Sequence, residues 1–216
     1  EQDLNQAIAI YDDQLEAYIE KAVLLYRQGK YQECIDAVET TQSRALKYYS
    51  KQSVANLYNI AAEADYALED YEAAIKMYQK ALGYAPEVPS YYQGAATAMI
   101  QLGNFSGAND VLEQMKAAIP QAEQSGDYQI VQGELLRKQG DLSGALQATY
   151  KAIEISDDND LLARAYRLAA SICEEIGESK ISEEIELLEH GIERLPGGFY
   201  NALAGQLATS YIRQAV

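Results

Sequence analysis

The sequence is poor in the residues that carry most enzymatic and metal chemistry. Its 216 residues include one histidine, His190, two cysteines, four prolines and no tryptophan. Histidine and cysteine are the usual protein ligands of zinc, so this composition argues against a metal site. His190 is expected on a regular helix with no strained nucleophile turn beside it, which argues against a catalytic triad. We therefore predict a non-enzymatic protein without catalytic residues, metal or cofactor.

The two cysteines are too few and too distant to form a disulfide framework. Cys34 and Cys173 lie 139 positions apart, and we predict that both are small fillers of the core. This usage fits a reducing compartment and is also compatible with export. The chain begins at Glu1 and shows no basic-then-apolar leader, so we interpret it as a processed or excised segment. Its location stays open between the cytoplasm and an exported, tethered protein.

Long apolar runs and positive charge are also scarce. No run of about 18 apolar residues occurs, so no segment is expected to insert into a membrane. The formal net charge is −16, from 33 acidic and 17 basic residues. Binding to a phosphate backbone requires the opposite sign, so nucleic acid and anionic membranes are poor partners. An alternative interpretation is that the acidic charge only keeps the protein soluble.

Alanine and tyrosine, in contrast, are plentiful and recur at a fixed spacing. Tyr58 and Tyr92 are 34 positions apart, and the residues that follow them repeat at the same interval. Such a period predicts stacked helical hairpins. The alanines would let two antiparallel helices approach closely, and the larger residues would fill the space between hairpins. The two copies consist of Tyr58, Ala61, Ala62, Tyr71, Ala74, Tyr78, Ala81 and Pro86, and of Tyr92, Ala95, Ala96, Phe105, Ala108, Leu112, Met115 and Pro120.

This pattern resembles the tetratricopeptide repeat (TPR), with alanine in place of its glycine. The resemblance implies an all-α fold, an alpha-alpha superhelix in which TPR helix hairpins form a right-handed solenoid. It covers nearly the whole chain, which we predict to be a single array over residues 1–216. The expected parts are a partial N-terminal helix at 3–14, repeats at 15–52, 53–88, 89–122, 123–158 and 159–196, and a C-terminal capping or truncated helix at 197–216.

Three departures from the pattern stand out. Six extra residues fall around Ser43–Ser53, where the absence of glycine and proline predicts longer helices rather than a loop. Gln129 occupies the aromatic position of its repeat. Glu184 stands where a small alanine is expected, and we predict that it weakens the register of the second helix of that repeat.

The resemblance implies a scaffold for protein–protein interaction that binds an extended peptide or a partner helix in its concave groove. The first helix of each repeat lines that groove. We predict peptide contacts from eight residues in these helices, which are Tyr26, Asn59, Tyr66 and Gln93 in the N-terminal half and Arg137, Lys138, Arg164 and Arg167 in the C-terminal half.

The four basic residues could bind a peptide carboxylate or acidic side chains, because guanidinium pairs well with carboxylate. Alternatively, each pairs with a neighbouring acid such as Glu134, Glu174 or Asp160. Chaperone-binding members of the family use a Lys/Asn clamp, where this sequence has Ile19 and Val23. The resemblance therefore does not extend to that activity.

A second class of function is compatible with the sequence. The chain could be a helical spacer or sensor segment of a larger regulator, or of a membrane-tethered, lipoprotein-like bacterial protein. A lipid-attachment cysteine upstream would favour the tethered protein, and a DNA-binding or kinase domain would favour the regulator. A homodimer through the C-terminal helix is also predicted, through an apolar face of Tyr200, Leu203, Leu207 and Tyr211.

Overall fold

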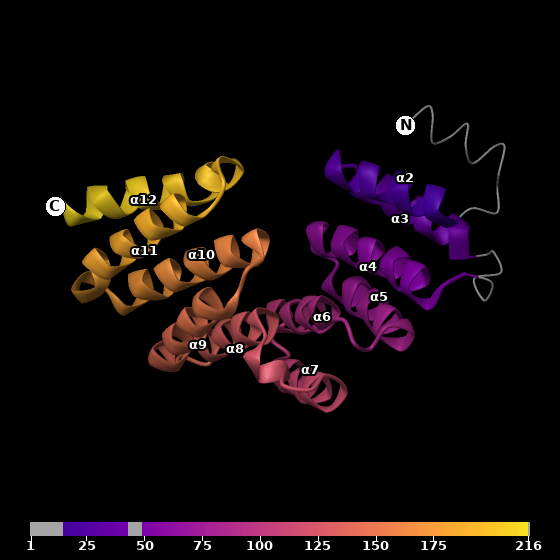
Figure 1. Cartoon of the computed structure of the whole chain (residues 1–216), viewed down its shortest axis with the longest axis horizontal. Coiled ribbons are helices and arrows are strands. Elements are labelled where there is room, and N and C mark those ends of the chain that lie inside the picture. Colours follow the sequence, from indigo (N-terminus) through magenta and orange to yellow (C-terminus); the bar gives the residue numbers. More distant parts are fainter. Residues whose placement is uncertain (1–14, 43–48, 216) are drawn as a thin grey trace. The chain divides into compact units, whose positions relative to one another are not determined.

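The computed structural model describes residues 15–42 and 49–215, which form a series of α-helices joined by short turns (Figure 1). The all-α class predicted from the sequence is confirmed. The chain divides into two compact units, unit 1 up to Ile119 and unit 2 from Pro120. The helix expected at 3–14 and most of the insertion near Ser43 lie outside the described residues. The boundaries of the individual repeats stay a prediction.

The described part of unit 1, residues 15–42 and 49–119, consists of three helical hairpins. They are α2 (Leu15–Arg27) with α3 (Tyr31–Gln42), α4 (Lys51–Ala67) with α5 (Tyr71–Tyr84), and α6 (Pro89–Gln101) with α7 (Phe105–Ala118). The first helix of the middle hairpin, α4, packs against both α2 and α6. It has 17 residues against 13 in each of these neighbours, so the described end of the insertion does extend a helix.

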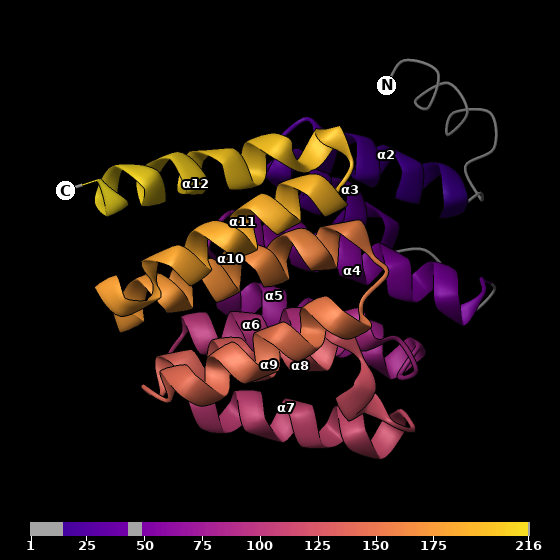
Figure 2. The same ribbon diagram turned by 60° about the vertical axis from the view of Figure 1, so that its left-hand side comes forward.

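Unit 2 continues the hairpin pattern. It contains α8 (Gly126–Lys138) with α9 (Leu142–Ile155), α10 (Asn159–Ile176) with α11 (Ile181–Arg194), and α12 (Tyr200–Gln214). Three 3-10 turns, η2 (Ala122–Gln124), η3 (Glu178–Lys180) and η4 (Gly197–Phe199), precede α8, α11 and α12. Helix α10 packs against α8 and α12, and Figure 2 shows these hairpins stacked one on the next.

The turn inside most hairpins uses one residue with positive φ and then a capping side chain. Gly29, Gly103 and Gly140 have φ of 72°, 73° and 87°, and Glu69 takes the same place with φ of 62°. Glycine adopts this conformation without steric cost, whereas the Cβ of Glu69 makes the same conformation unfavourable. The side chain of the next residue then caps the second helix by accepting a hydrogen bond from a backbone N–H that has no partner within the helix. The three caps are Asp70 with Ala73, Asn104 with Gly107, and Asp141 with Gly144.

The alanines of the repeated pattern lie where the helices of each hairpin cross. Ala62, Ala74, Ala96 and Ala108 are fully buried, which confirms the packing role predicted for them. Because no side chain beyond Cβ separates the backbones at these points, the helices approach closely. The periodic core is therefore built from small residues at the crossings and larger residues between hairpins.

Both cysteines are also in the core. Cys34 and Cys173 are fully buried and free, as predicted. Burial raises the pKa of each thiol to about 11. Since the thiolate is the reactive form, neither sulfur is suited to nucleophilic or redox chemistry at neutral pH.

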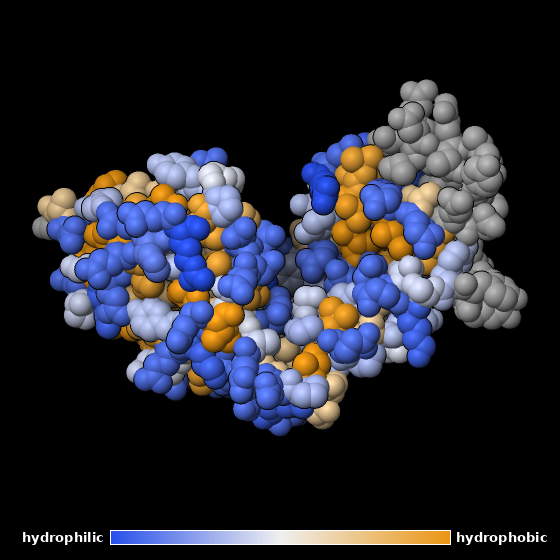
Figure 3. All heavy atoms as spheres, viewed as in Figure 1, coloured by the Kyte–Doolittle hydropathy of each residue, from blue (hydrophilic) through white to orange (hydrophobic). Residues whose placement is uncertain are grey.

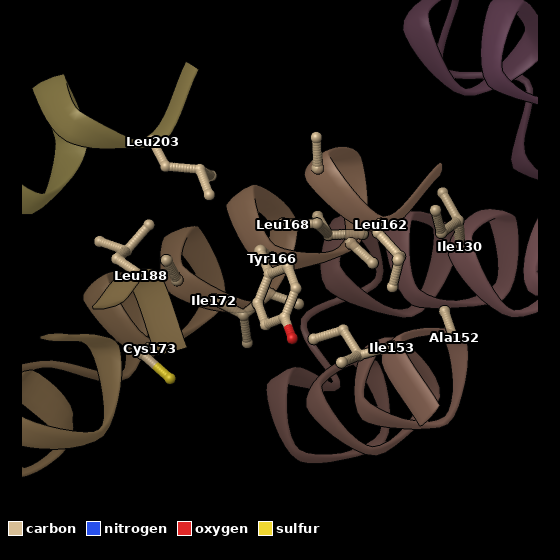
Figure 4. Packing of buried hydrophobic residues seen from close by; sticks show 14 of the residues in the cluster. Ile130, Ala152, Ile153, Leu162, Tyr166, Leu168, Ile172, Cys173, Leu188 and Leu203 are labelled. Atoms are coloured by element: carbon tan, nitrogen blue, oxygen red, sulfur yellow. The ribbon is translucent and has the colours of Figure 1, made fainter. Parts of the chain in front are cut away.

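The core of unit 2 is centred on Tyr166. Its ring lies in one cluster with Leu188 and Leu203, so that α10, α11 and α12 share a single core (Figure 4). Gly191 permits this packing, because a Cβ there would come within 2.8 Å of Leu203 Cδ1 and 2.9 Å of Tyr166 Cγ. Leu203 is thus fully buried and cannot belong to the outward apolar face that the sequence predicted for a homodimer.

The two atypical residues of unit 2 are buried but satisfied by polar partners. Gln129 donates from Nε2 to the carbonyl oxygen of Glu123 at 2.6 Å, which ties η2 to α8. Glu184, only 1% exposed, accepts a hydrogen bond from Ser210 Oγ at 2.5 Å and pairs with Arg213. Helix α11 runs uninterrupted through Glu184, because α12 supplies the groups that a buried carboxylate requires.

Candidate protein-binding faces

The first helices of unit 1 form a surface that we call inner face 1, made by side chains of α2, α4 and α6 that include Tyr26, Glu63 and Tyr66. Helix α4 is at its centre because α4 packs against both α2 and α6. Its side chains toward this face recur at helical spacing and are exposed or half-buried. They are Gln52, Asn56, Asn59, Glu63 and Tyr66.

Two predicted contact residues of inner face 1, Tyr26 and Tyr66, occupy equivalent places in successive hairpins. The ring of Tyr26 packs on Tyr31 with centroids 5.4 Å apart, and the ring of Tyr66 packs edge-on to Tyr71 at 5.2 Å. In each pair the first tyrosine lies in the last turn of a first helix and the second begins the next helix. Both inner tyrosines are half-buried and fixed by these ring contacts.

Glu63 lies in α4, one helical turn before Tyr66. It accepts a hydrogen bond of 2.8 Å from the hydroxyl of Tyr78, whose ring is buried under α6. Burial, followed by the Glu63 charge, raises the pKa of Tyr78, and the hydroxyls of Tyr26 and Tyr66 add to the shift. Burial and the same carboxylate also raise the pKa of Tyr26. The Glu63 carboxylate thus accepts a hydrogen bond from Tyr78, lies close enough to the Tyr26 hydroxyl to raise its pKa, and is one helical turn before Tyr66 on α4.

The amide residues of inner face 1 differ in accessibility. Asn59 is half-buried, whereas Gln93, on α6, is only 7% exposed and offers little side-chain surface to a ligand. Beside them, Tyr91 donates to Asn56 Oδ1 at 2.8 Å, and Gln52 donates to Asn56 at 2.8 Å and to Tyr91 at 3.1 Å. This network joins α4 to α6 and leaves the face polar along its length.

The corresponding surface of unit 2, inner face 2, consists of the side of α8 and α10 that lies away from α9 and α11. Two of its predicted contact residues already have partners. Arg137 donates from Nε to Glu175 Oε1 at 2.7 Å, and Arg164 lies 3.4 Å from Glu134 Oε1. These pairs join α8 to α10. Of the two interpretations of the basic residues, pairing with neighbouring acids therefore holds for Arg137 and Arg164.

The other two basic residues are exposed. Lys138 ends α8 and Arg167 lies in α10, and neither makes an ion pair with any residue that the structure describes. The structure therefore places Tyr26, Glu63 and Tyr66 on the packed helices α2 and α4 of unit 1, and joins Arg137 and Arg164 to acids in unit 2. Sequence spacing places Glu63 on the same groove-lining face as Asn59 and Tyr66, although it was not one of the eight predicted contacts.

Other features of the described part of the chain are His190, the acidic side chains and a polar depression. His190 is exposed, and its Nδ1 lies 3.1 Å from the hydroxyl of the buried Tyr166. This contact holds the imidazole ring in place but does not bring a nucleophile to it. Among residues 15–42 and 49–215, no three side chains of metal-binding type come together. None of the helices in these ranges is long and apolar enough to cross a membrane. A depression between α2 and α3 is lined mainly by polar side chains, including Lys21, Glu33, Asp36 and Thr40.

The visible surface is mostly hydrophilic (Figure 3). Large apolar side chains with at least a third of their area exposed are scattered over both units and include Leu68, Leu102, Ile176 and Ile212. Scattered exposure of this kind is normal for a folded protein. The inner faces therefore present tyrosine rings, amides and single charges rather than an apolar patch.

Two family models, both described as tetratricopeptide repeat, match the chain over residues 13–87 and 65–129. A curated relative is the small glutamine-rich tetratricopeptide repeat-containing protein 2 of Mycosarcoma maydis, which is 31% identical over 124 residues. The match covers 56% of this chain and 34% of the relative, so it spans about a third of the relative's length.

Solved structures show the same fold. A thermophilic TPR protein of Thermus thermophilus superposes with a TM-score of 0.72 at 16% identity, over 92% of this chain and all of that one. A chain of the APC/C hetero-tetramer Cut9-Hcn1 gives 0.74 at 14% identity, over 98% of this chain and 39% of that one. The repeated pattern, the stacked hairpins and these matches agree, and the chain belongs to the tetratricopeptide repeat family.

Proposed function

We propose that this chain is a non-enzymatic scaffold that holds an extended peptide or a helix of a partner protein against the faces of its first helices. TPR proteins mediate protein–protein interactions and are generally scaffolds without enzymatic activity. The observation that carries the proposal is inner face 1, where Tyr26 and Tyr66 present half-buried rings fixed by a second tyrosine. Tyrosine buries contact area with few rotors to freeze, which favours binding.

The mechanism that we propose is preorganisation. The hairpins hold the contact side chains in place before the partner arrives, so that most of the ordering cost falls on the partner segment. The similar chain from the Cut9-Hcn1 hetero-tetramer belongs to an assembly of proteins, which supports a protein partner. Amide side chains along α4 add hydrogen-bonding capacity for the backbone of an extended segment.

A pull-down with the whole chain as bait, quantified by mass spectrometry, tests this function. We expect partners to be lost with Tyr26→Ala/Tyr66→Ala, which removes both rings of inner face 1. Arg164→Glu/Arg167→Glu tests inner face 2 in the same way. Tyr84→Ala is the control, because this tyrosine is 37% exposed and lies on the second helix α5. Unchanged partners in both test variants would rule out binding at these faces.

A further inference from the structure

We propose that inner face 1 receives a lysine or arginine side chain of the partner segment, with the carboxylate of Glu63 as its ion partner and the rings of Tyr26 and Tyr66 as flanking surfaces. The inference rests on the proposed function and specifies the chemistry of the ligand that unit 1 takes.

The first step of the argument is the charge of Glu63. On the inner side of α4 its neighbours at helical spacing are the neutral residues Asn59 and Tyr66. Tyr78 donates to Oε1 of Glu63 and fixes the carboxylate, but a hydroxyl supplies no positive charge. Within the part of the chain that the structure describes, Glu63 forms no ion pair. A half-buried carboxylate without a cation is therefore available to a basic ligand through charge-assisted hydrogen bonds.

The second step is the aromatic surface beside this carboxylate. Tyr26 and Tyr66 belong to helices α2 and α4, which pack against each other. Ring faces attract ammonium and guanidinium groups when the cation lies within about 6 Å of the ring centroid. Since Tyr31 and Tyr71 already hold the two rings, a cation would meet them without further ordering.

The third step excludes the other ligand chemistries. An acidic side chain would bring a like charge to Glu63, and an aliphatic one would bury the carboxylate without compensation, which is costly. The basic residue next to Tyr26, Arg27, is exposed and makes no ion pair with Glu63. Both ring quadrupole and carboxylate therefore favour the same kind of ligand, a cation on a flexible stem.

The test is a selection of random twelve-residue peptides on the whole chain by display, followed by sequencing. With the wild-type chain we expect the selected peptides to be enriched in lysine and arginine. Glu63→Gln should remove this enrichment, although glutamine can still accept the Tyr78 hydrogen bond. Glu72→Gln is the matched control, because Glu72 is exposed on α5, and its loss should leave the enrichment unchanged.

Affinities of one selected peptide then isolate the charge. Glu63→Gln should weaken binding by roughly five- to tenfold, as expected for a partly desolvated ion pair with cation–π support. A version of the peptide with norleucine in place of the basic residue should bind both proteins equally. Arg27→Gln should keep or increase the affinity of the basic peptide, because it removes a like charge.

The outcomes separate this inference from the proposed function. Selected peptides that lack basic residues, or that keep them with Glu63→Gln, would overturn the inference while peptide binding stands. Failure of every protein to select any peptide would overturn both. Thermal unfolding of each variant, followed by circular dichroism, checks that a lost enrichment does not reflect a lost fold.

Discussion

Among the residues that the structure describes, each unit has one fully buried carboxylate, and the two differ in their partners. In unit 2, Glu184 is 1% exposed and is satisfied by Ser210 and Arg213. In unit 1, Asp65 is 6% exposed and has no cation partner among the described residues. Burial, together with the charges of Asp70 and Glu39, raises the pKa of Asp65 to about 6. The buried carboxylate of Glu184 thus fixes α12 in unit 2, whereas the charged form of Asp65 is unfavourable in unit 1.

The two units also differ in their packing. Unit 1 contains the two copies of the repeat that match the pattern at most positions, and the alanines of these copies are buried between the two helices of each hairpin. Unit 2 departs from the pattern and adds specific polar contacts between helices. Arg194 of α11, for example, donates to the carbonyl oxygens of Ile153 and Ser156 at the end of α9. Unit 1 has polar contacts between helices as well, for example between α4 and α6, so the two units differ in how regularly the apolar pattern repeats rather than in whether polar groups join their helices.

The largest effect is expected from Arg213→Ala in unit 2. The substitution leaves Glu184 buried with only the Ser210 hydrogen bond, and breaking a buried pair from one side is costly. We expect a loss of about 3 kcal/mol in the free energy of unfolding, measured by chemical denaturation. Hydrogen exchange should show that α12 is the first helix to open.

The matched substitution is Glu184→Ala, which restores the small residue of the repeat pattern. Arg213 would keep Glu174, at 3.1 Å, and Ser210 would keep the carbonyl of Gln206, at 2.9 Å. The loss should then be about 1 kcal/mol or less, since a half-exposed arginine can reach water. Equal losses for the two substitutions would show that the pair is not the anchor of α12.

Much of the fold follows from sequence spacing, because the 34-residue period fixes which positions face the core. The burial of Ala74 and Ala108 was predictable in this way. The period does not specify which polar atoms meet across hairpins. Glu184 and Arg213 are 29 positions apart, and nothing in the repeat pattern relates them. The sequence therefore indicated that Glu184 was unusual but not what would satisfy it.

Less of the candidate binding faces could be predicted. The spacing placed Tyr26 and Tyr66 on first helices. The burial of Gln93, in contrast, depends on how closely α6 packs against its neighbours α5 and α7. The pairing of Arg137 with Glu175 depends on the contact between α8 and α10. The closeness of Glu63 to Tyr26 required the packing of α2 on α4. Residues of neighbouring hairpins decide which charged side chains on the surface are paired, and the sequence of a single repeat does not specify these neighbours.

A second prediction tests the close packing of unit 1. Gly94 of α6 lies against the ring of Tyr78, and a Cβ there would come within 2.3 Å of Tyr78 Cζ. Because Tyr78 is only 1% exposed and is bonded to Glu63, the ring has little room to move. We expect Gly94→Ala to cost about 2 kcal/mol in the free energy of unfolding, measured by urea denaturation, through overpacking.

Gly83→Ala on α5 is the control for this substitution. A Cβ at Gly83 would meet no atom within 4 Å, and alanine is the better helix former. This variant should be as stable as the wild-type chain or slightly more stable. If Gly94→Ala matched it, the ring of Tyr78 would be free to shift, and the fixed position of the Glu63 carboxylate would be in doubt.

The smallest effect should have the opposite sign and concerns Asp65. The pKa of Asp65 lies above its ordinary value of 3.8, at about 6, so between these pH values the folded state holds a proton that the unfolded state releases. Stability therefore falls as the pH rises through this window and stays lower above it.

Asp65→Asn should raise the free energy of unfolding by about 1–2 kcal/mol at pH 8 and change it little at pH 4. Urea denaturation at both pH values measures this difference, with Asp110→Asn, on the exposed side of α7, as control. An equal gain at both pH values would mean that Asp65 acts through packing rather than charge, and the contrast with Glu184 would then not be electrostatic.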